Sequence, residues 1–300
     1  MTIKHLVISG GGPLGLRYLG ALEKLEKENF WKVDNIESIY GTSVGSMIGA
    51  FICLKYDWET LNKYIIERPW NDAFKMNAKQ IVDSYYNKGL FDKKLVEIIF
   101  KPLLQGKNIE MNVTLKEFYD FSKIDFHIFT FELNNFETIE LSHLTHPNLS
   151  LLQALTMSSA FPGIFMPTII DKKCYIDGGV MSNYPINQCL RDHTNKDEIL
   201  GIKISYDKDN NSFKNAEITE ELSLLEYVMC FTTNAMNFIR STVKLENIDN
   251  TIECNMTENY SNFLDFFQQT ITNQELRQQW IQMGEEDATK FLSKNVSVVL

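Results

Sequence analysis

The sequence lacks the cysteine pattern of a secreted or metal-binding protein. It holds five cysteines and no C-x-x-C pair: Cys53, Cys174, Cys189, Cys230 and Cys254. An odd number of isolated cysteines, several of them in apolar runs, favours free buried thiols in a reducing compartment over disulfides or a metal site. Histidines and cysteines do not cluster at ligand spacing, so we expect no metal and no cofactor.

Long hydrophobic runs are also absent. No apolar stretch reaches the roughly 18 residues that a membrane-spanning helix needs. The N-terminus, MTIKHLVISGGG, runs directly into a predicted strand and a glycine loop, and it shows no signal peptide. We therefore expect an intracellular protein without a transmembrane segment, located in the cytoplasm or at the periphery of a membrane.

The chain is short of positive charge. Lysine and arginine total 29 against 39 aspartate and glutamate residues, which gives a net charge of −10 at pH 7. Nucleic acid requires clustered lysine and arginine, so we expect no nucleic-acid partner. The same balance argues against purely electrostatic docking on an anionic membrane. With 44% hydrophobic and 12% aromatic residues, the chain can bury a substantial core and does not resemble a disordered protein.

Apolar strands alternate with helices in the first part of the chain. Residues 5–9 and 36–40 are predicted strands, and residues 14–29 and 45–55 are predicted helices. This order is typical of parallel strands with helices on both faces. Further strands are predicted at 124–133, 137–142, 174–176, 198–205 and 252–255. Helices are predicted within 57–106, with breaks at Pro69 and Pro102, and at 149–158, 220–243 and 273–293. Because no segment resembles a linker, we expect residues 1–300 to form a single α/β domain.

A glycine loop follows the first predicted strand. G10GGPLG15 fits the pattern G-x-G-x-x-G and opens a helix, whose unpaired amides attract negative charge. A dinucleotide site would need an acidic residue at the end of the second strand, where this chain has Y40GTS43. A phosphate-binding Walker loop would need G-K-[ST], which G15LR17 does not supply. The remaining interpretations are a cradle for a transient oxyanion and a turn without a ligand.

A serine lies between two glycines in G41TSVG45, which fits G-x-S-x-G. An apolar strand precedes the motif and a helix follows it, which is the context of a nucleophile elbow. Gly41 and Gly45 suit such an elbow because larger side chains two residues from the nucleophile would clash. The start of the helix would also favour negative charge on Ser43. The alternative is that Ser43 serves only as an N-cap.

A serine nucleophile needs a proton acceptor. The sequence holds five histidines: His5, His127, His143, His146 and His193. None has a distinctive setting, although His143 and His146 stay open as bases. Asp177 is a different candidate, because it ends a predicted strand and precedes Gly178 and Gly179. The carboxyl edge of an open α/β sheet is where sites form. The alternative for D177GG179 is a solvated turn.

These motifs together resemble the patatin-like phospholipases, which are lipid acyl hydrolases with a serine–aspartate dyad. The resemblance rests on G10GGPLG15, G41TSVG45 and D177GG179 in that order, supported by S158SAFPGIFMP167, N183YP185 and T114LKEF118. It covers about residues 4–205. Residues from about 206 to 300 show no such match, and we expect them to form a C-terminal helical elaboration. The implied fold is a three-layer patatin-type α/β structure with a mostly parallel central sheet flanked by helices.

The resemblance also implies roles for individual residues. Ser43 would be the nucleophile and Asp177 the base. The amides of Gly10, Gly11 and Gly12 would form the oxyanion hole. The supporting motif glycines would be Gly15, Gly41, Gly45, Gly178 and Gly179. Leu14 stands where many members carry a basic residue, and Arg17 lies one turn later.

The implied activity is that of a phospholipase A-type esterase acting on phospholipid or another acyl lipid, with transient contact to a membrane surface. Candidate apolar contacts are Pro69-Trp70 with Phe74, residues 161–166, and Phe263 with Phe266-Phe267; ordinary core packing is the alternative for each. Residues 161–166 are the best candidates to line an acyl pocket, because they lead towards Asp177. Two other functions stay open: an esterase or thioesterase for soluble acyl substrates, and a catalytically silent lipid-binding scaffold on the same fold. The sequence predicts no oligomeric state.

Overall fold

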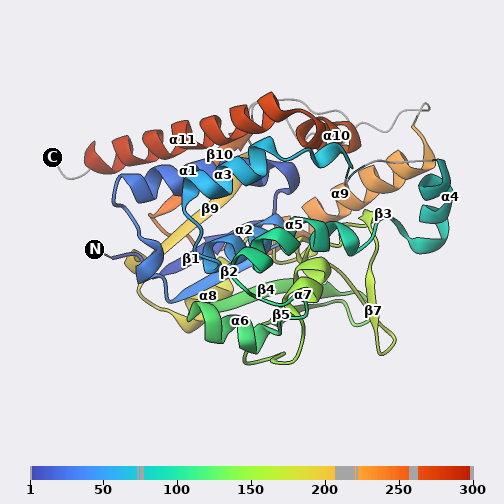
Figure 1. Cartoon of the computed structure of the whole chain (residues 1–300), viewed down its shortest axis with the longest axis horizontal. Helices are drawn as coiled ribbons and strands as arrows, with labels where there is room; N and C mark the ends of the chain where they lie inside the picture. Colours follow the sequence, from blue (N-terminus) through green and yellow to red (C-terminus); the bar gives the residue numbers. More distant parts are fainter. Residues whose placement is uncertain are drawn as a thin grey trace.

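The computed structural model describes residues 2–72, 74, 78–206, 220, 222–256 and 263–297. Within these residues, eight strands form one sheet in the order β10-β9-β1-β2-β4-β8-β7, with β5 also paired to β4 (Figure 1). Five neighbouring strands are parallel: β10 (Thr251–Met256), β9 (Ile199–Tyr206), β1 (His5–Ile8), β2 (Ser38–Thr42) and β4 (Asp125–Glu132). Three strands run antiparallel to their neighbours: β5 (Glu137–Leu141), β8 (Lys173–Asp177) and β7 (Thr168–Ile170).

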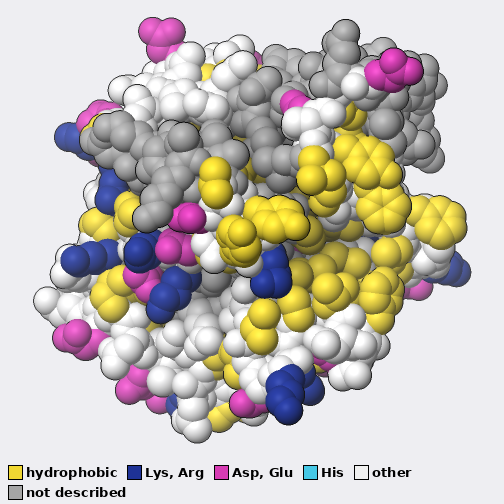
Figure 2. All heavy atoms as spheres, turned by 90° about the vertical axis from the view of Figure 1, so that its right-hand side faces the viewer, with side chains coloured by type: hydrophobic (Ala, Val, Ile, Leu, Met, Phe, Trp, Pro, Cys, Tyr) yellow, Lys and Arg dark blue, Asp and Glu magenta, His cyan; other side chains and the backbone are white. Residues whose placement is uncertain are grey.

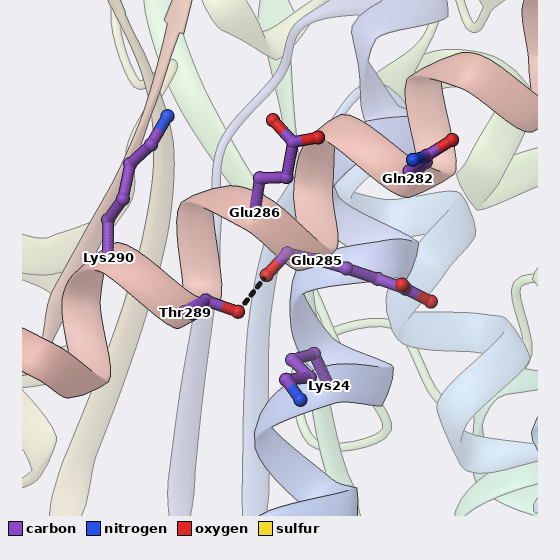
Figure 3. A pocket seen from close by; sticks show the side chains of 6 residues that line it. All are labelled: Lys24, Gln282, Glu285, Glu286, Thr289 and Lys290. Carbon is purple, nitrogen blue, oxygen red and sulfur yellow. Dashed lines mark hydrogen bonds between the residues drawn. The ribbon is translucent and has the colours of Figure 1, made fainter.

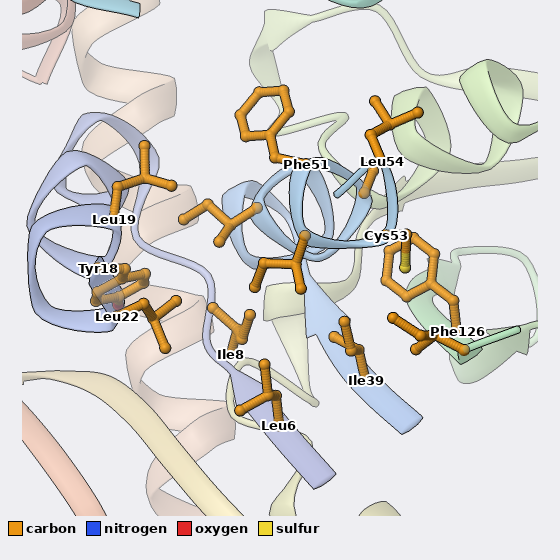
Figure 4. Close-up of a cluster of buried hydrophobic side chains, with 14 of the residues drawn as sticks. Leu6, Ile8, Tyr18, Leu19, Leu22, Ile39, Phe51, Cys53, Leu54 and Phe126 are labelled. Carbon is orange, nitrogen blue, oxygen red and sulfur yellow. The ribbon is translucent and has the colours of Figure 1, made fainter. Parts of the chain in front are cut away.

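Helices cover both faces of the sheet, so its central strands are apolar on both sides. Leu6 and Ile8 of β1 point towards α1 (Gly15–Lys27) and α2 (Val44–Cys53), as Figure 4 shows. Val7, between them, packs on the other face with residues of α8 (Ile186–Asp192). This two-sided burial explains why the strands appear in the sequence as short continuous apolar runs.

The remaining helices extend the layer over α2 or lie at one end of the sheet. The main apolar cluster takes side chains from α3 (Trp58–Glu67), α5 (Lys94–Gly106), α6 (Leu115–Ser122), α7 (Leu151–Ser158) and α11 (Gln274–Ser297). At the right-hand end of Figure 1 lie α4 (Ala78–Asn87) and α9 (Leu224–Thr242). Helix α10 (Phe263–Thr272) precedes α11. Among the described residues, no helix is both long and apolar enough to cross a membrane.

The C-terminal helix α11 packs against α1 at unusually close range. A methyl group on Gly284 would lie 2.0 Å from the carbonyl oxygen of Arg17, so only glycine allows this approach. The Arg17 side chain is buried and its Nε donates to Oδ2 of Asp287 on α11 at 3.0 Å. Strand β10 joins the central sheet beside β9. Residues beyond 206 therefore contribute to the sheet as well as to helices, and the division into a patatin-like region and a C-terminal elaboration stays a prediction.

The predicted elements are confirmed in type, with a few exceptions. Helix α3 ends at Glu67, just before Arg68 and Pro69, as expected for a residue that precedes proline. The predicted break at Pro102 is wrong, because α5 continues through it to Gly106. Buried side chains on both sides of the proline, Phe100, Leu103 and Leu104, hold the helix in the main apolar cluster. Three helices, α6, α8 and α10, were not predicted, nor were the short strands β3 (Gly89–Phe91), β6 (Gly163–Phe165) and β7.

Candidate active site

Ser43 lies in a strained turn between β2 and α2. Its backbone angles are φ 54° and ψ −127°, a conformation that costs a residue with a side chain on the order of 1–3 kcal/mol. The turn is also crowded. A methyl group on Gly45 would lie 2.2 Å from the Ile8 carbonyl oxygen, and one on Gly41 would lie 2.8 Å from the Gly45 carbonyl oxygen. The G-x-S-x-G spacing is thus explained by backbone contact on both sides of a strained serine.

The Ser43 side chain does not cap the helix that follows it. Its Oγ instead donates a hydrogen bond of 2.6 Å to Oδ2 of Asp177. The Ser43 backbone N–H donates to Oγ of Ser158 at 2.9 Å, and that hydroxyl donates to the Phe129 carbonyl at 2.6 Å. The N-cap interpretation of Ser43 is therefore wrong. Ser158, to which the sequence analysis gave no role, holds the serine turn to β4.

The register of β4 explains how positions 43 and 177 meet. Phe129 of β4 pairs with Thr42 at the end of β2, and the next residue, Thr130, pairs with Asp177 at the end of β8. Strand β2 runs parallel to β4 and β8 runs antiparallel to it. The C-terminal ends of β2 and β8 nevertheless lie beside two consecutive residues of β4, Phe129 and Thr130. This brings the Ser43 hydroxyl and the Asp177 carboxylate together.

Asp177 is buried and held by backbone groups. Its side chain is 4% exposed, and Oδ1 accepts a hydrogen bond of 2.7 Å from the Gly179 N–H. Its own N–H donates to the Ala160 carbonyl at 3.0 Å. Burial raises the pKa of the Asp177 carboxyl, while hydrogen bonds from Ser43 and Gly179 and the charge of Arg240 act in the opposite direction. The result is a carboxylate that is more basic than an ordinary aspartate and in contact with a hydroxyl proton.

Arg240 reaches this turn from α9, outside the region that the sequence motifs cover. Its Nε donates to the Gly179 carbonyl. Gly179 is thus held by Arg240 through its C=O and by Asp177 through its N–H. The sequence held one signal for Arg240. The only charged residues in α9 are Glu226 and Arg240, and the capping box with Ser223 accounts for Glu226, so Arg240 is the one charge in the helix to which the local sequence gives no role.

The glycine loop lies against the serine turn. A methyl group on Gly10 would lie 3.2 Å from Cβ of Ser43. The Gly10 N–H donates to the Asn183 carbonyl at 2.9 Å, so this amide already has an acceptor in the structure, and the oxyanion-hole role expected of Gly10 stays a prediction. The N–H groups of Gly11 and Gly12 make no hydrogen bond within the described part of the chain. Gly12, with φ 54°, begins the short 3₁₀ turn Gly12–Leu14. Two amides without a hydrogen-bond partner in the described part of the chain therefore follow directly on Gly10, which lies against Ser43.

The five histidines have their polar contacts elsewhere. His5 and His193 contact the Ser38 hydroxyl, His127 contacts Asp125 and Glu140, His143 lies 3.1 Å from Asp125, and His146 contacts Thr145. None of these partners belongs to the serine turn or to the D177GG179 turn. Among the described residues, no group of three His, Cys, Asp or Glu side chains gathers in a way that could hold a metal ion.

This chain has Leu14 where many members of the family carry a basic residue, and Arg17, one turn later, does not take the place of that basic residue. Arg17 is committed to Asp287 of α11, and its guanidinium lies over the ring of Trp280. Leu14 itself is buried in an apolar cluster with Phe266 and Trp280. The corner of the loop is thus apolar, and Arg17 serves the packing of α1 against α11.

The apolar segments that were candidates for lipid contact are largely core. Trp70 is 7% exposed and Phe266 is 3% exposed, so core packing is the right interpretation for both. The side chain of Phe263 lies outside those that the structure describes. Phe161 follows the Ala160 carbonyl that binds Asp177, and it packs in two apolar clusters. Residues 161–166 thus adjoin the dyad, and their role as an acyl pocket stays a prediction.

A polar depression between α1 and α11 is a separate feature. Figure 3 shows its lining residues: Lys24, Gln282, Glu285, Glu286, Thr289 and Lys290. The Thr289 hydroxyl donates to the Glu285 carbonyl within the helix at 2.8 Å. None of the residues in the serine, glycine or aspartate turns lines this depression.

Known proteins resemble this chain in sequence. Residues 6–190 match the family model described as patatin-like phospholipase. An uncharacterized protein of Acanthamoeba polyphaga mimivirus is 28% identical over 211 residues, covering 70% of this chain and 68% of the relative. A protein of Invertebrate iridescent virus 6, named a probable lipid hydrolase, is 28% identical over 200 residues, covering 65% of this chain and 66% of the relative.

A solved structure shares the fold. VipD from Legionella pneumophila superimposes with a TM-score of 0.53 at 17% identity, covering 97% of this chain and 67% of VipD. At that identity the likeness concerns the fold alone. The matched regions span about two thirds of the length of both viral relatives and of VipD.

Proposed function

The chain belongs to the patatin-like phospholipase family, and on that premise we propose that it is a lipid acyl hydrolase, a phospholipase A-type esterase with a serine–aspartate dyad. The observation that carries the proposal is the hydrogen bond of 2.6 Å from Ser43 Oγ to Asp177 Oδ2 inside a strained turn. Strain at a residue that contacts a buried carboxylate is characteristic of an activated nucleophile rather than of a structural serine.

In this mechanism Asp177 takes the proton of Ser43 while the serine oxygen attacks the ester carbonyl. The carbonyl oxygen becomes an oxyanion, which the N–H groups of Gly11 and Gly12 stabilise, each contributing about 2.7–4 kcal/mol. The bond to the leaving alcohol breaks, and the protonated Asp177 returns its proton to that alcohol. Water then gives a proton to Asp177 and attacks the acyl-enzyme, which releases the fatty acid and restores the serine.

Burial of the base supports this assignment. A carboxylate with an ordinary pKa is a weak base for a hydroxyl, and burial raises the pKa of Asp177. The Gly179 N–H fixes Oδ1, so that Oδ2 faces the hydroxyl. The substrate that we propose is a phospholipid or another acyl lipid, which the enzyme would meet by transient contact with a membrane surface.

The proposal is tested with a serine-directed fluorophosphonate probe and two kinds of ester. The wild type should be labelled and Ser43→Ala should not. The wild type should also hydrolyse vesicle phospholipid faster than short soluble esters. Absence of labelling in a folded wild type would favour a silent lipid-binding scaffold. Labelling together with a preference for soluble esters or thioesters would favour the soluble-substrate esterase.

A further inference from the structure

Helix α9 carries an apolar face that no described part of the chain covers. Its exposed large apolar side chains are Leu224, Tyr227, Val228, Phe231 and Phe238, of which Phe231 is 63% and Phe238 71% exposed. Spacings of three, four and seven residues place 224, 227, 228 and 231 on one side of the helix, and a further seven residues lead to 238. Large apolar side chains clustered in this way on a surface mark an interaction site.

Helix α4 lies at the same end of the molecule and adds further apolar side chains. Tyr85 is 78% exposed, Tyr86 is 73% exposed and Val82 is 64% exposed. Helix α4 leads into β3, which pairs with β6. Met229 on the inner side of α9 packs in one cluster with residues of β3 and β6. Figure 2 shows hydrophobic side chains gathered over this end. We call these eight exposed side chains of α4 and α9 the α4–α9 face.

The inner side of α9 leads directly to the dyad. Met236 packs with Val180, which follows the D177GG179 turn, and Arg240 contacts Gly179. Phe161 belongs to the clusters of both Met229 and Met236. A single helix therefore presents apolar side chains outwards and touches the turn of the catalytic aspartate inwards.

The charges around the face suit a lipid surface. The two charged residues of α9 have contacts away from the exposed apolar side chains: Glu226 caps the helix and Arg240 binds Gly179. Lys88 is exposed and joins α4 to β3. Its charge acts on the Cys174 thiol of β8, which places it near the exposed Lys172 and Lys173 at the start of that strand, beside the exposed Asp171. Lysines beside an apolar and tyrosine-rich face complement anionic head groups above an acyl layer.

We propose that the α4–α9 face binds the surface of a phospholipid bilayer that contains anionic lipid, and so places the dyad at the lipid interface. The proposal rests on the proposed function, because an acyl-lipid substrate gives the face its occupant. The apolar side chains enter the boundary between head groups and acyl chains, and the lysines contact phosphate. This face differs from the segments around Trp70 and Phe266, which are buried.

The experiment measures co-sedimentation with vesicles of phosphatidylcholine and phosphatidylglycerol, in a Ser43→Ala background that prevents hydrolysis. Phe231→Ser combined with Phe238→Ser should weaken vesicle binding by about tenfold or more, because two apolar side chains no longer leave water. The same double substitution in the active protein should slow hydrolysis of vesicle phospholipid while leaving a short soluble ester unaffected. Tyr85→Ser with Tyr86→Ser, on the other helix, is a second variant with the same expected result.

Leu144→Ser is the matched control. Leu144 is 71% exposed, like Phe238, but it follows β5 and neighbours His143, which contacts Asp125 at the opposite end of β4 from the dyad. It should bind vesicles as the wild type does. The proposal would be overturned if the wild-type protein did not co-sediment with vesicles. It would also be overturned if the double variants bound vesicles as well as Leu144→Ser does. A dimer that both double variants dissociate, without vesicle binding, would assign the face to a second copy of the chain.

The two proposals fail in different ways. If the wild type hydrolyses short esters but does not bind vesicles, the ester hydrolase stands and the lipid-binding face is wrong. If the wild type binds vesicles through Phe231 and Phe238 but hydrolyses no ester, the face stands and the proposed enzyme is wrong.

Discussion

The Ser43 hydroxyl donates a hydrogen bond of 2.6 Å to the Asp177 carboxylate, although 134 positions separate the two residues. Neighbouring residues of β4 bring them together, because Phe129 pairs with the end of β2 and Thr130 pairs with the end of β8. The contact is thus a product of sheet register rather than of flexible loops, and the surrounding strands keep both side chains in place.

Ser158 is expected to act as a positioning residue for the nucleophile. Its hydroxyl accepts from the Ser43 N–H and donates to the Phe129 carbonyl. Ser158→Ala leaves both backbone groups without this partner, which should cost about 1–3 kcal/mol of unfolding free energy. We also expect kcat to fall about tenfold with little change in KM, since a displaced nucleophile harms the chemical step. Urea denaturation and steady-state kinetics test this, and an unchanged kcat would contradict it.

Arg240 is expected to set the pH dependence of the base. Its positive charge acts against the rise in the pKa of Asp177 that burial causes. Without that charge, Arg240→Gln should raise the carboxyl pKa further, so the acid limb of kcat/KM should move to higher pH. Arg240→Lys keeps the charge and should restore the limb in part.

The control for this pH profile is Arg191→Gln, which removes an exposed arginine that pairs with Glu140. It should leave the acid limb in place. An acid limb that is identical in the wild type and in Arg240→Gln would show that Arg240 has no electrostatic effect on the base.

Acid should destabilise the fold through His5. This imidazole is buried and stacks on His193 with ring centroids 3.6 Å apart, and burial followed by that neighbour lowers its pKa from 6.5 to about 4. Between these pH values the unfolded chain binds more protons, so the unfolding free energy is full above pH 6.5 and falls as the pH drops towards 4. We expect a loss of about 1–2 kcal/mol. Urea denaturation at pH 7 and pH 5 measures it, and His5→Gln should flatten the difference.

His127 should make the fold less stable as the pH rises, because its protonated form is the stabilising one. Burial alone would lower its pKa, but the carboxylates of Asp125 and Glu140 outweigh burial and raise it to about 9. The contribution of His127 to the free energy of unfolding is therefore complete below pH 6.5 and is lost as the pH rises towards 9. His127→Gln should therefore reduce stability at pH 6.5 more than at pH 9.5. Equal losses at both values would contradict a charged His127.

The buried pair of Arg17 and Asp287 should hold α11 against α1. Arg17→Met removes a hydrogen-bonded partner of the buried Asp287 carboxylate and leaves it the ion pair with Lys290, whose Nζ lies 4.0 Å away; breaking a buried pair typically costs about 3–5 kcal/mol. Adding Asp287→Leu removes that charge, so the double variant should recover most of the loss. Thermal and urea unfolding of the two single variants and the double variant form a cycle that tests the pairing. Losses that simply add would show that the two residues do not interact.

Much of the fold and the dyad could be predicted because they rest on local patterns. The apolar runs of β1 and β2, the helix after each, and the glycines that flank Ser43 are all read from neighbouring residues. The hydrogen bond from the Gly10 amide could not be predicted, because the Asn183 carbonyl that accepts it lies 173 positions away. Arg240 and Ser158 were missed for the same reason: their partners are backbone groups fixed by tertiary packing.

Short elements were missed for another reason. Strands β3, β6 and β7 have three residues each, too few to show an alternating pattern. The predicted break at Pro102 failed because buried side chains such as Phe100 and Leu104 hold α5 together across the proline. The apolar segments around Trp70 and Phe266 could not be told from surface contacts by composition, since burial depends on what packs over them.

The most direct test of the dyad is turnover of a lipid ester by Asp177→Asn beside His143→Ala and His146→Ala. The carboxamide cannot take the serine proton, so Asp177→Asn should lose about 10²–10⁴-fold in kcat/KM with an unchanged melting curve. Both histidine variants should retain wild-type turnover. Full activity in Asp177→Asn, or its loss in a folded histidine variant, would contradict Asp177 as the base.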